Sequence, residues 1–207
     1  MKKTPHRKER ERKRHREEIL GAAEEIFADK GFHRTTVEDV AVRAEFSVGT
    51  IYNIFTGKED LYQSLIKQRC QEISDEAHAA LDQATNPLFL VEMFIRAKID
   101  IFTKYQAFMK LYTRERMGDR FANNELWRET VAPLYEQIRD RMVEAFAKGI
   151  QEGIFDSLAD PWELYIALEG ITDGFLYDWL IHPEKTSFKD KYAIMLKLFF
   201  DGVRKRA

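Results

Sequence analysis

The apolar residues of this chain recur with the spacing of an α-helix over almost its whole length, and this period constrains the fold more than any other feature. A clear example lies near the N-terminus, where positions i, i+3, i+4, i+7 and i+8 are Ile19, Ala22, Ala23, Ile26 and Phe27. We find no alternating pattern of the kind that predicts a β-strand. Only ten glycines and five prolines stand among 207 residues, so turns are few. The sequence predicts an all-α protein of about nine helices.

The composition excludes several classes of protein. Hydrophobic residues make up 44% of the chain, which is too many for a disordered protein, yet no apolar run approaches the roughly 18 residues of a membrane span. Cys70 is the single cysteine, which excludes an internal disulfide and a thiolate metal site and favours a reduced, cytoplasmic location. We also expect no signal peptide, because no apolar segment follows the basic N-terminal residues.

The net charge of −2 conceals a strong asymmetry. Residues 1–16 hold nine basic and two acidic side chains, a net of +7, so the other 191 residues hold 24 basic and 33 acidic ones, a net of −9. Such a basic segment is expected to bind phosphate groups on nucleic acid or anionic lipid, unless it is only a solubilising, disordered end. Membrane binding would need bulky apolar residues on one helix face, and the segment has none before Ile19.

Three short helices are predicted after the basic segment. The first ends at Gly31. Thr35 and Thr36 stand three residues before acidic side chains, so each is a capping-box start for a second helix of about eight residues. Ser47 can cap a third helix over residues 48–55. The second and third helices, joined by a tight turn, form a helix-turn-helix unit.

The predicted third helix has two unlike faces. Its apolar side carries Val48, Ile51, Ile54 and Phe55, and its other side carries Gly49, Thr50, Tyr52 and Asn53. So short a helix has little reason to expose that second set unless it approaches a surface closely, as in a DNA major groove. Hydroxyl groups suit phosphate oxygens, asparagine can pair with adenine, and Val48 in the first turn can contact a thymine methyl group. The alternative is an ordinary polar helix face.

These motifs resemble the DNA-binding domain of TetR-family transcriptional regulators over about residues 17–62. The matching positions are Thr35-Thr36-Val37-Glu38-Asp39-Val40-Ala41, Ala44, Ser47, Gly49-Thr50-Ile51-Tyr52, Phe55 and Lys58-Glu59-Asp60-Leu61. The resemblance implies a basic arm at 1–16, a DNA-binding domain at 17–62 and a ligand-binding and dimerisation domain at 63–207. The chain departs from the family at Glu45, where a turn glycine is usual, and at Asn53-Ile54, which replaces a common His-Tyr pair. A glutamate in that turn is expected to alter it locally.

The resemblance also implies which residues contact DNA. Thr36 would cap its helix and contact a phosphate, Val48 and Gly49 would face bases, Thr50 and Tyr52 would contact phosphates, Asn53 would contact a base or phosphate, and Lys58 would anchor the DNA backbone. Basic segments before such a domain can enter the adjacent minor groove. We therefore predict DNA contacts for Lys13, Arg14 and Arg16, the alternative being a solvated segment or an extension of the first helix.

The remaining chain is expected to be helical as well. The predicted helices span residues 58–80, 88–103, 106–117, 125–152, 161–180 and 188–205. Pro133 should kink the fourth of these or mark its true first turn.

Aromatic and methionine side chains in this region are mostly core, but they are also able to line an adaptable apolar pocket. The predicted lining is Phe94, Phe102, Met109, Tyr112, Trp127 and Tyr135. Glu169 and Asp173 are either exposed or paired with a neighbouring arginine, or else they favour a cationic ligand. A symmetric helical dimer interface is predicted at Gly170, Gly174, Leu196, Phe199 and Phe200.

The resemblance implies a ligand-responsive repressor that binds a palindromic DNA operator as a homodimer and is released by a small apolar or amphipathic effector. A constitutive or ligand-activated DNA-binding regulator is the alternative. A helical di-iron enzyme is a remote option, since it needs two Glu-x-x-His pairs and only Asp75-Glu76-Ala77-His78 comes near. We predict no catalytic residue, no cofactor, no metal and no membrane partner.

Overall fold

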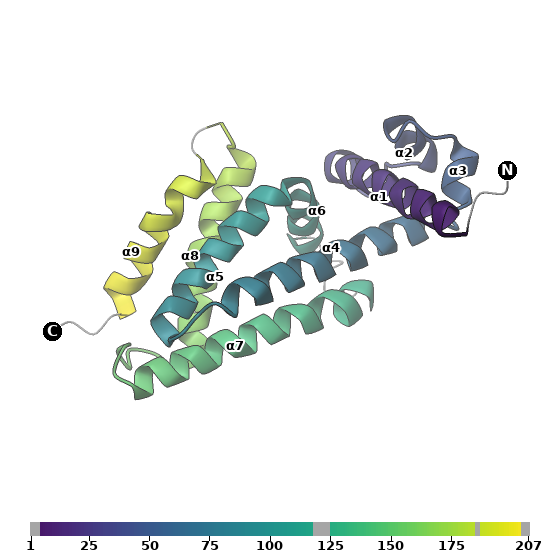
Figure 1. Ribbon diagram of the computed structural model, residues 1–207. Helices are drawn as coiled ribbons and strands as arrows, with labels where there is room; N and C mark the ends of the chain where they lie inside the picture. The colour runs from purple at the N-terminus through teal and green to yellow at the C-terminus, as the bar shows by residue number, and fades with distance from the viewer. Residues whose placement is uncertain (1–4, 118–124, 185–186, 204–207) are drawn as a thin grey trace. The chain divides into compact units, whose positions relative to one another are not determined.

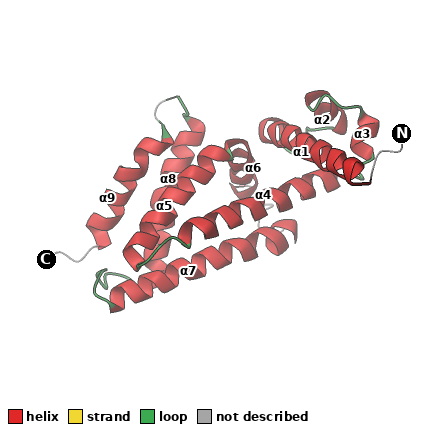
Figure 2. Cartoon of the chain, viewed as in Figure 1, coloured by secondary structure: helices red, strands yellow, loops and turns green. Residues whose placement is uncertain are grey.

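The computed structural model describes residues 5–117, 125–184 and 187–203, and the regular elements within these ranges are helices (Figure 1; Figure 2). The nine α-helices of the described ranges are α1 (Pro5–Lys30), α2 (Val37–Arg43), α3 (Val48–Tyr52), α4 (Lys58–Leu81), α5 (Pro87–Lys104), α6 (Gln106–Met117), α7 (Ala132–Gln151), α8 (Pro161–Ile181) and α9 (Tyr192–Val203). A π-helical segment, Trp127–Val131, precedes α7, and a 3-10 turn, Phe188–Lys191, precedes α9. The prediction of an all-α fold with about nine helices is confirmed.

The chain divides into two compact units. The first comprises Met1–Cys70 and Ala107–Trp127, and the second comprises Gln71–Gln106 and Arg128–Ala207. Helix α6 therefore belongs with α1, α2, α3 and the first part of α4, whereas α5, α7, α8 and α9 form the second unit. The functional boundary predicted between residues 62 and 63 falls within α4 and stays a prediction.

In the first unit, local capping starts the two helices of the helix-turn-helix. The Asp39 amide donates to Thr36 Oγ1 at 3.1 Å, and the Thr36 amide donates to Asp39 Oδ2 at 3.0 Å, so the capping box at Thr36 is confirmed. The Thr50 amide donates to Ser47 Oγ at 3.1 Å at the start of α3. Buried Phe27 of α1 and buried Ile51 of α3 contribute to the core of this unit.

Helix α3 is shorter than the predicted span of residues 48–55. It ends at Tyr52, and Asn53 is its C-cap. The Thr56 amide donates a hydrogen bond to the Asp60 carboxylate at 2.8 Å. This bond holds the chain in a turn just before α4 begins. Phe55 lies beyond the end of α3 but remains buried. The five-residue helix is therefore anchored by apolar side chains within it and after it.

Residues 5–16 form the first half of α1, which is the helix extension stated as an alternative, and the DNA contacts of this segment stay a prediction. Lysine, arginine and glutamate are good helix formers. Two ion pairs support the helix, each between residues one helical turn apart: Arg7 with Glu11 at 3.2 Å, and Arg14 with Glu18 at 3.5 Å. Residues 1–4 lie outside the described ranges.

The later helices begin and end close to their predicted bounds, with two differences. The predicted helix over 125–152 is interrupted by the π-helical segment. Pro133 lies in the first turn of α7, which is one of the two positions predicted for it. The last predicted helix, 188–205, begins with the 3-10 turn and is described only to Val203.

The second unit has its own core of large apolar side chains from α5, α7, α8 and α9. Phe146 of α7 and Phe199 of α9 are fully buried, with ring centroids 5.7 Å apart. A methyl group at Gly149 would overlap the ring of Phe155, so this glycine lets the ring lie against α7. The chain turn after α7 therefore packs back on the core.

Glu45, in the turn between α2 and α3, adopts a left-handed backbone conformation with φ of 58°. The turn thus keeps a glycine-like conformation although the residue is glutamate, which costs about 1 kcal/mol or more. We expect Glu45→Gly to raise the free energy of unfolding by about 1 kcal/mol in urea denaturation, because relief of strain exceeds the added freedom of the unfolded chain.

The matched control is Gln63→Gly, at an exposed position inside α4. That substitution should lower the free energy of unfolding by about 1 kcal/mol. A loss of stability with Glu45→Gly would show that the side chain, and not its backbone strain, dominates at this turn.

Candidate functional site

Helix α3 presents a small polar surface to solvent. Ile51 faces the core, while Gly49, Tyr52 and Asn53 are exposed and Val48 and Thr50 are half-buried. The Tyr52 side chain is 53% exposed, an unusual position for a large ring. The Thr50 and Ser47 hydroxyl groups are 2.8 Å apart, so both are held at the start of the helix. The structure brings the predicted α3 contacts together on one side of a rigidly capped turn.

Gly49 has no steric role inside the chain. A methyl group there would meet only Ser47 Oγ, at 3.8 Å, which is an ordinary van der Waals distance. Glycine inside a helix costs roughly 1 kcal/mol relative to alanine. Nothing within the described chain therefore requires a glycine at this position.

The other residues predicted for this surface have partners of their own. Thr36 is exposed and caps α2, as expected. Lys58 Nζ donates to the Phe32 carbonyl oxygen at 3.1 Å and lies 4.5 Å from the centre of the Phe32 ring. Lys58 therefore ties the start of α4 to the turn that follows α1, while remaining partly exposed.

Of the three basic residues predicted to contact DNA, Arg16 differs from Lys13 and Arg14 in its surroundings. Arg16 donates to Gln68 Oε1 at 2.9 Å, and its guanidinium lies 5.3 Å from the centre of the Phe55 ring. Arg14 pairs with Glu18, and Lys13 is exposed. Arg16 is thus half-buried between α1, α4 and the turn after α3, where it holds these elements together.

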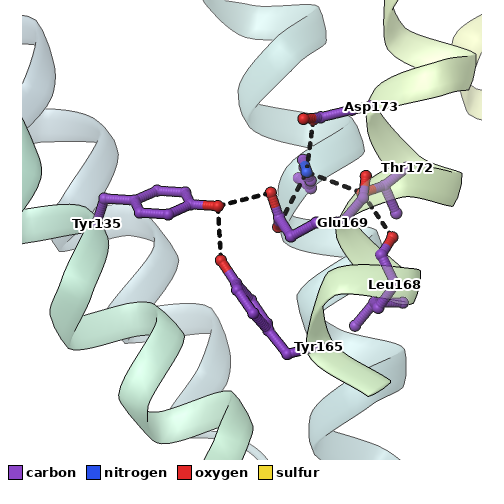
Figure 3. A network of polar contacts seen from close by, with 7 residues as sticks. Tyr135, Tyr165, Leu168, Glu169, Thr172 and Asp173 are labelled. Atoms are coloured by element: carbon purple, nitrogen blue, oxygen red, sulfur yellow. Dashed lines mark hydrogen bonds and ion pairs between the residues drawn. The ribbon is translucent and has the colours of Figure 1, made fainter. Parts of the chain in front are cut away.

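The second unit contains a buried network of charged and hydroxyl groups (Figure 3). Lys98 Nζ of α5 lies 3.1 Å from Glu169 Oε1 and 2.8 Å from Asp173 Oδ1, and it donates to Thr172 Oγ1 at 2.8 Å; all three partners are on α8. On the other side of Glu169, the Tyr135 hydroxyl of α7 donates to Glu169 Oε2 at 2.9 Å. The network therefore joins α5, α7 and α8.

Two tyrosine hydroxyl groups complete the network in series. The Tyr165 hydroxyl donates to the Tyr135 hydroxyl at 2.6 Å, and Tyr135 in turn donates to Glu169, as Figure 3 shows. Burial, and then the charge of Glu169, raise the pKa of both tyrosines, so both stay protonated and act as donors.

The network contains one ammonium group and two carboxylates. Burial alone would lower the pKa of Lys98, but the charges of Glu169 and Asp173 outweigh it and raise the pKa, so Lys98 is charged. Two acidic side chains thus face the one ammonium group in these contacts. Of the alternatives stated for Glu169 and Asp173, pairing with a basic side chain is closest to the structure. The basic side chain is Lys98 of the same chain and not an arginine.

The structure gathers part of the predicted pocket around Lys98. Its ammonium lies 5.7 Å from the ring centres of both Phe94 and Phe102, and Tyr135 joins through Glu169. Met109 and Tyr112 belong to the first unit, and the side chain of Trp127 lies outside what the structure describes. The pocket stays a prediction.

Sequence analysis missed Lys98, Tyr165 and Thr172. Lys98 did carry a signal, because it stands four residues from both Phe94 and Phe102 and so lies on the buried stripe of its helix. Its partners are more than 70 positions further along the chain, and the helical period alone cannot pair them.

Apolar side chains are exposed along α8 and α9. Ile166 of α8 is 50% exposed and Leu198 of α9 is 55% exposed, and Gly170 and Gly174 of α8 are exposed with no atom within 4 Å of an added methyl group. The predicted interface residues Leu196 and Phe200 are half-buried. Phe199 is only 2% exposed and packs in the core of its own chain, so its assignment to a surface was wrong.

Other kinds of site find little support. Within the described ranges, no three His, Cys, Asp or Glu side chains are grouped so that they could hold a metal ion. Burial raises the pKa of the Cys70 thiol to about 12, so it is not a nucleophile at neutral pH. None of the described helices is both long enough and apolar enough to cross a membrane.

Comparisons with known proteins agree with this geometry. A family described as "Bacterial regulatory proteins, tetR family" matches residues 19–65. The HTH-type transcriptional repressor BepR of Brucella suis is 27% identical over 180 residues, which cover 82% of each chain. The HTH-type transcriptional repressor KstR2 of Mycobacterium tuberculosis is 26% identical over 140 residues, 68% of each chain.

Solved structures show the same fold over nearly the whole chain. The ketosteroid transcriptional regulator KstR2 of Mycobacterium tuberculosis superposes with a TM-score of 0.80 at 23% identity, covering 92% of this chain and 95% of that one. The transcriptional regulator FadR of Bacillus subtilis, in complex with stearoyl-CoA, has a TM-score of 0.72 at 21% identity and covers 89% of this chain and 97% of that one.

The buried network generates a prediction for stability. We expect Lys98→Met to lower the free energy of unfolding by about 3 to 5 kcal/mol, because buried Glu169 and half-buried Asp173 lose their cation. Adding Glu169→Gln and Asp173→Asn to Lys98→Met should recover part of this loss, since the uncompensated charges are then removed. Urea denaturation of the three proteins measures both effects.

Lys197→Met, which removes an exposed lysine of α9, is the control and should change stability little. If Lys98→Met were equally silent, the ammonium would not be what compensates Glu169 and Asp173.

Proposed function

Because the chain belongs to the TetR family of bacterial transcriptional regulators, we propose that it binds a palindromic operator as a homodimer and is released from it by a small-molecule effector. It is a DNA-binding transcriptional repressor by family and not an enzyme. Such a regulator acts in the cytoplasm, together with the DNA.

The observation that carries the proposal is the exposed side of α3. Nothing within the protein requires a glycine at position 49, because an added methyl group would make only an ordinary van der Waals contact. A bare backbone at this place allows close approach to the base edges of a major groove. Val48 and Gly49 would face bases, and Asn53 a base or a phosphate. The predicted phosphate contacts are Thr36, Thr50, Tyr52 and Lys58.

The experiment begins with the purified protein selecting duplexes from a random library. With the selected duplex, we expect Gly49→Ala to lower affinity by about tenfold or more, because the methyl group intrudes on the groove, while helix propensity makes the protein slightly more stable. Tyr52→Ala should abolish specific binding without loss of fold. Fluorescence anisotropy and circular dichroism measure the two effects separately.

Gln63→Ala, at an exposed position on α4, is the control and should bind like the wild type. Full affinity in Gly49→Ala and Tyr52→Ala together would exclude α3 as the recognition helix. A selection without any enriched sequence would contradict the proposed function itself.

We assign the exposed apolar side of α8 and α9 to a second copy of the chain. Two exposed glycines one turn apart let helices approach closely, and a two-fold axis pairs the same patch on both subunits. Two half-sites of a palindromic operator require such a two-fold dimer. We infer that the interface contains Ile166, Gly170, Gly174 and Leu198, together with the half-buried Leu196 and Phe200.

Ile166→Glu should therefore shift the protein towards the monomer in sedimentation velocity, because a charge would be buried against its own copy. Leu158→Glu, in the exposed segment before α8, adds the same charge at a similarly exposed apolar residue and should leave the assembly unchanged. A monomeric wild-type protein, or an unaltered Ile166→Glu dimer, would contradict this interface.

We propose that the effector binds in the second unit beside the network of Lys98. Phe94 and Phe102 offer apolar surface, and the two acidic side chains that face Lys98 disfavour a ligand carboxylate and favour a cationic or hydrogen-bond-donating group. The acyl chain of the stearoyl-CoA bound to FadR of Bacillus subtilis supports a ligand with a large apolar part. An amphipathic molecule with a neutral or cationic polar group fits both observations.

A further inference from the structure

Residues 5–16 of the basic segment form the first part of α1, and two of their side chains pack beside α3. The His15 ring lies 4.9 Å from the ring of Phe46, which precedes α3, and the Arg16 guanidinium lies 5.3 Å from the ring of Phe55, which follows it. Arg16 also donates to Gln68 Oε1 of α4 at 2.9 Å. Figure 1 shows the dark purple, N-terminal part of α1 next to α3. Residues 5–14 therefore start from a fixed point at the side of α3.

Lys8 and Arg12 continue the face by which α1 packs on its own unit. Counted from Lys8, they lie at i and i+4, His15 at i+7 and Ile19 at i+11, which is one side of a helix. Ile19 is fully buried, whereas Lys8 and Arg12 are exposed and have no ion-pair or hydrogen-bond partner in the described part of the chain. The same face is thus apolar where it meets the protein and basic where it extends past it.

Helix dimensions decide what this basic face is able to bind. An α-helix with side chains is about 10 to 12 Å wide, and the minor groove of B-DNA is only about 6 Å wide. A helical segment therefore does not enter the minor groove as an extended arm would. The phosphate backbone beside the groove remains, with one negative charge per roughly 1.7 Å of duplex.

We propose that Lys8 and Arg12 bind phosphates of the operator that flank the groove occupied by α3, and that His15 and Arg16 are positioning residues for them. The inference rests on the proposed DNA-binding function and deepens it. At about 1.5 Å per residue, Arg12 and Lys8 lie about 6 Å and 12 Å along the helix from Arg16. Each subunit thereby extends its footprint outside the half-site without reading sequence.

An anionic membrane is the other common partner of a basic helix, and the segment does not suit it. Membrane-surface helices need bulky apolar residues opposite their cations. The opposite side of this segment instead carries Arg10 and Lys13, both exposed.

Arg10 and Lys13 on the opposite side provide a matched control, which also tests the sequence-based prediction of a DNA contact at Lys13, because only Lys8 and Arg12 are inferred here to bind phosphate. Lys8→Gln with Arg12→Gln, and Arg10→Gln with Lys13→Gln, each remove one lysine and one arginine from the same stretch of α1. With the operator duplex, we expect the first pair to lower affinity about tenfold at 0.1 M salt, with the salt dependence of log K shallower by about 0.9 per lost contact. The second pair should have less than half of each effect.

Rigidity is tested by Glu11→Pro against Glu11→Ala. Both remove the same carboxylate, but only proline breaks the helix between Lys8 and Arg12. We expect Glu11→Ala to bind at least as well as the wild type and Glu11→Pro to bind several-fold more weakly, with the same operator preference. Circular dichroism should show less helix only in Glu11→Pro.

The outcomes separate this inference from the proposed function. Equal losses in the two double variants would mean that the segment acts only as diffuse charge, and equal affinities of the two Glu11 variants would mean a flexible arm; either result overturns the inference while DNA binding stands. If the wild-type protein selects no duplex at all, both proposals fail. Binding to phosphatidylserine vesicles that competes with the duplex and is lost in Lys8→Gln with Arg12→Gln would transfer the surface to lipid and also overturn it.

Discussion

The burial of Ile51 and Phe55 is the constraint on which the exposed surface of α3 depends. Helix α3 has five residues, far fewer than the roughly 12 to 15 that an isolated helix needs even to be marginally stable in water. Its orientation is therefore set by tertiary contacts, with the Ser47 cap at one end and buried Phe55 beyond the other. Arg16 packs on the same Phe55 ring, so the position of α3 and that of the first half of α1 depend on one side chain.

Both units bury charged side chains in ion pairs between helices. In the first unit, Arg69 of α4 pairs with Glu24 of α1 at 2.6 Å. In the second, Lys98 faces Glu169 and Asp173, and hydroxyl groups from Tyr135, Tyr165 and Thr172 extend the hydrogen bonding across three helices. Removing one member of such a buried network costs far more than removing an exposed charge, because the groups left behind have no water to replace it.

Helical period and capping residues predict most of the fold, because both signals are local. The capping box at Thr36 and the first turn at Pro133 follow from a few adjacent residues. The period fails in α9, where residues 194–196 and 198–200 are all apolar, so no stripe distinguishes buried Phe199 from exposed Leu198. In the basic segment the charge pattern alone does not distinguish an arm from a helix, and only the helix-forming lysine, arginine and glutamate residues favour the helix that residues 5–16 adopt. The partners of Lys98 depend on tertiary packing, and the functional roles of the site residues remain predictions.

The described glycines inside helices fall into two groups. Gly149 is required by folding, since any side chain would collide with Phe155. Gly21, Gly49, Gly170 and Gly174 meet no such obstacle in their own chain. A mutational scan scored by abundance in the cell should therefore tolerate alanine at these four positions and not at Gly149. On the proposed roles of α3 and α8, a scan scored by repression should also reject alanine at Gly49, Gly170 and Gly174 but still tolerate it at Gly21. The difference between the two scans would separate a glycine that folding needs from glycines that a partner molecule needs.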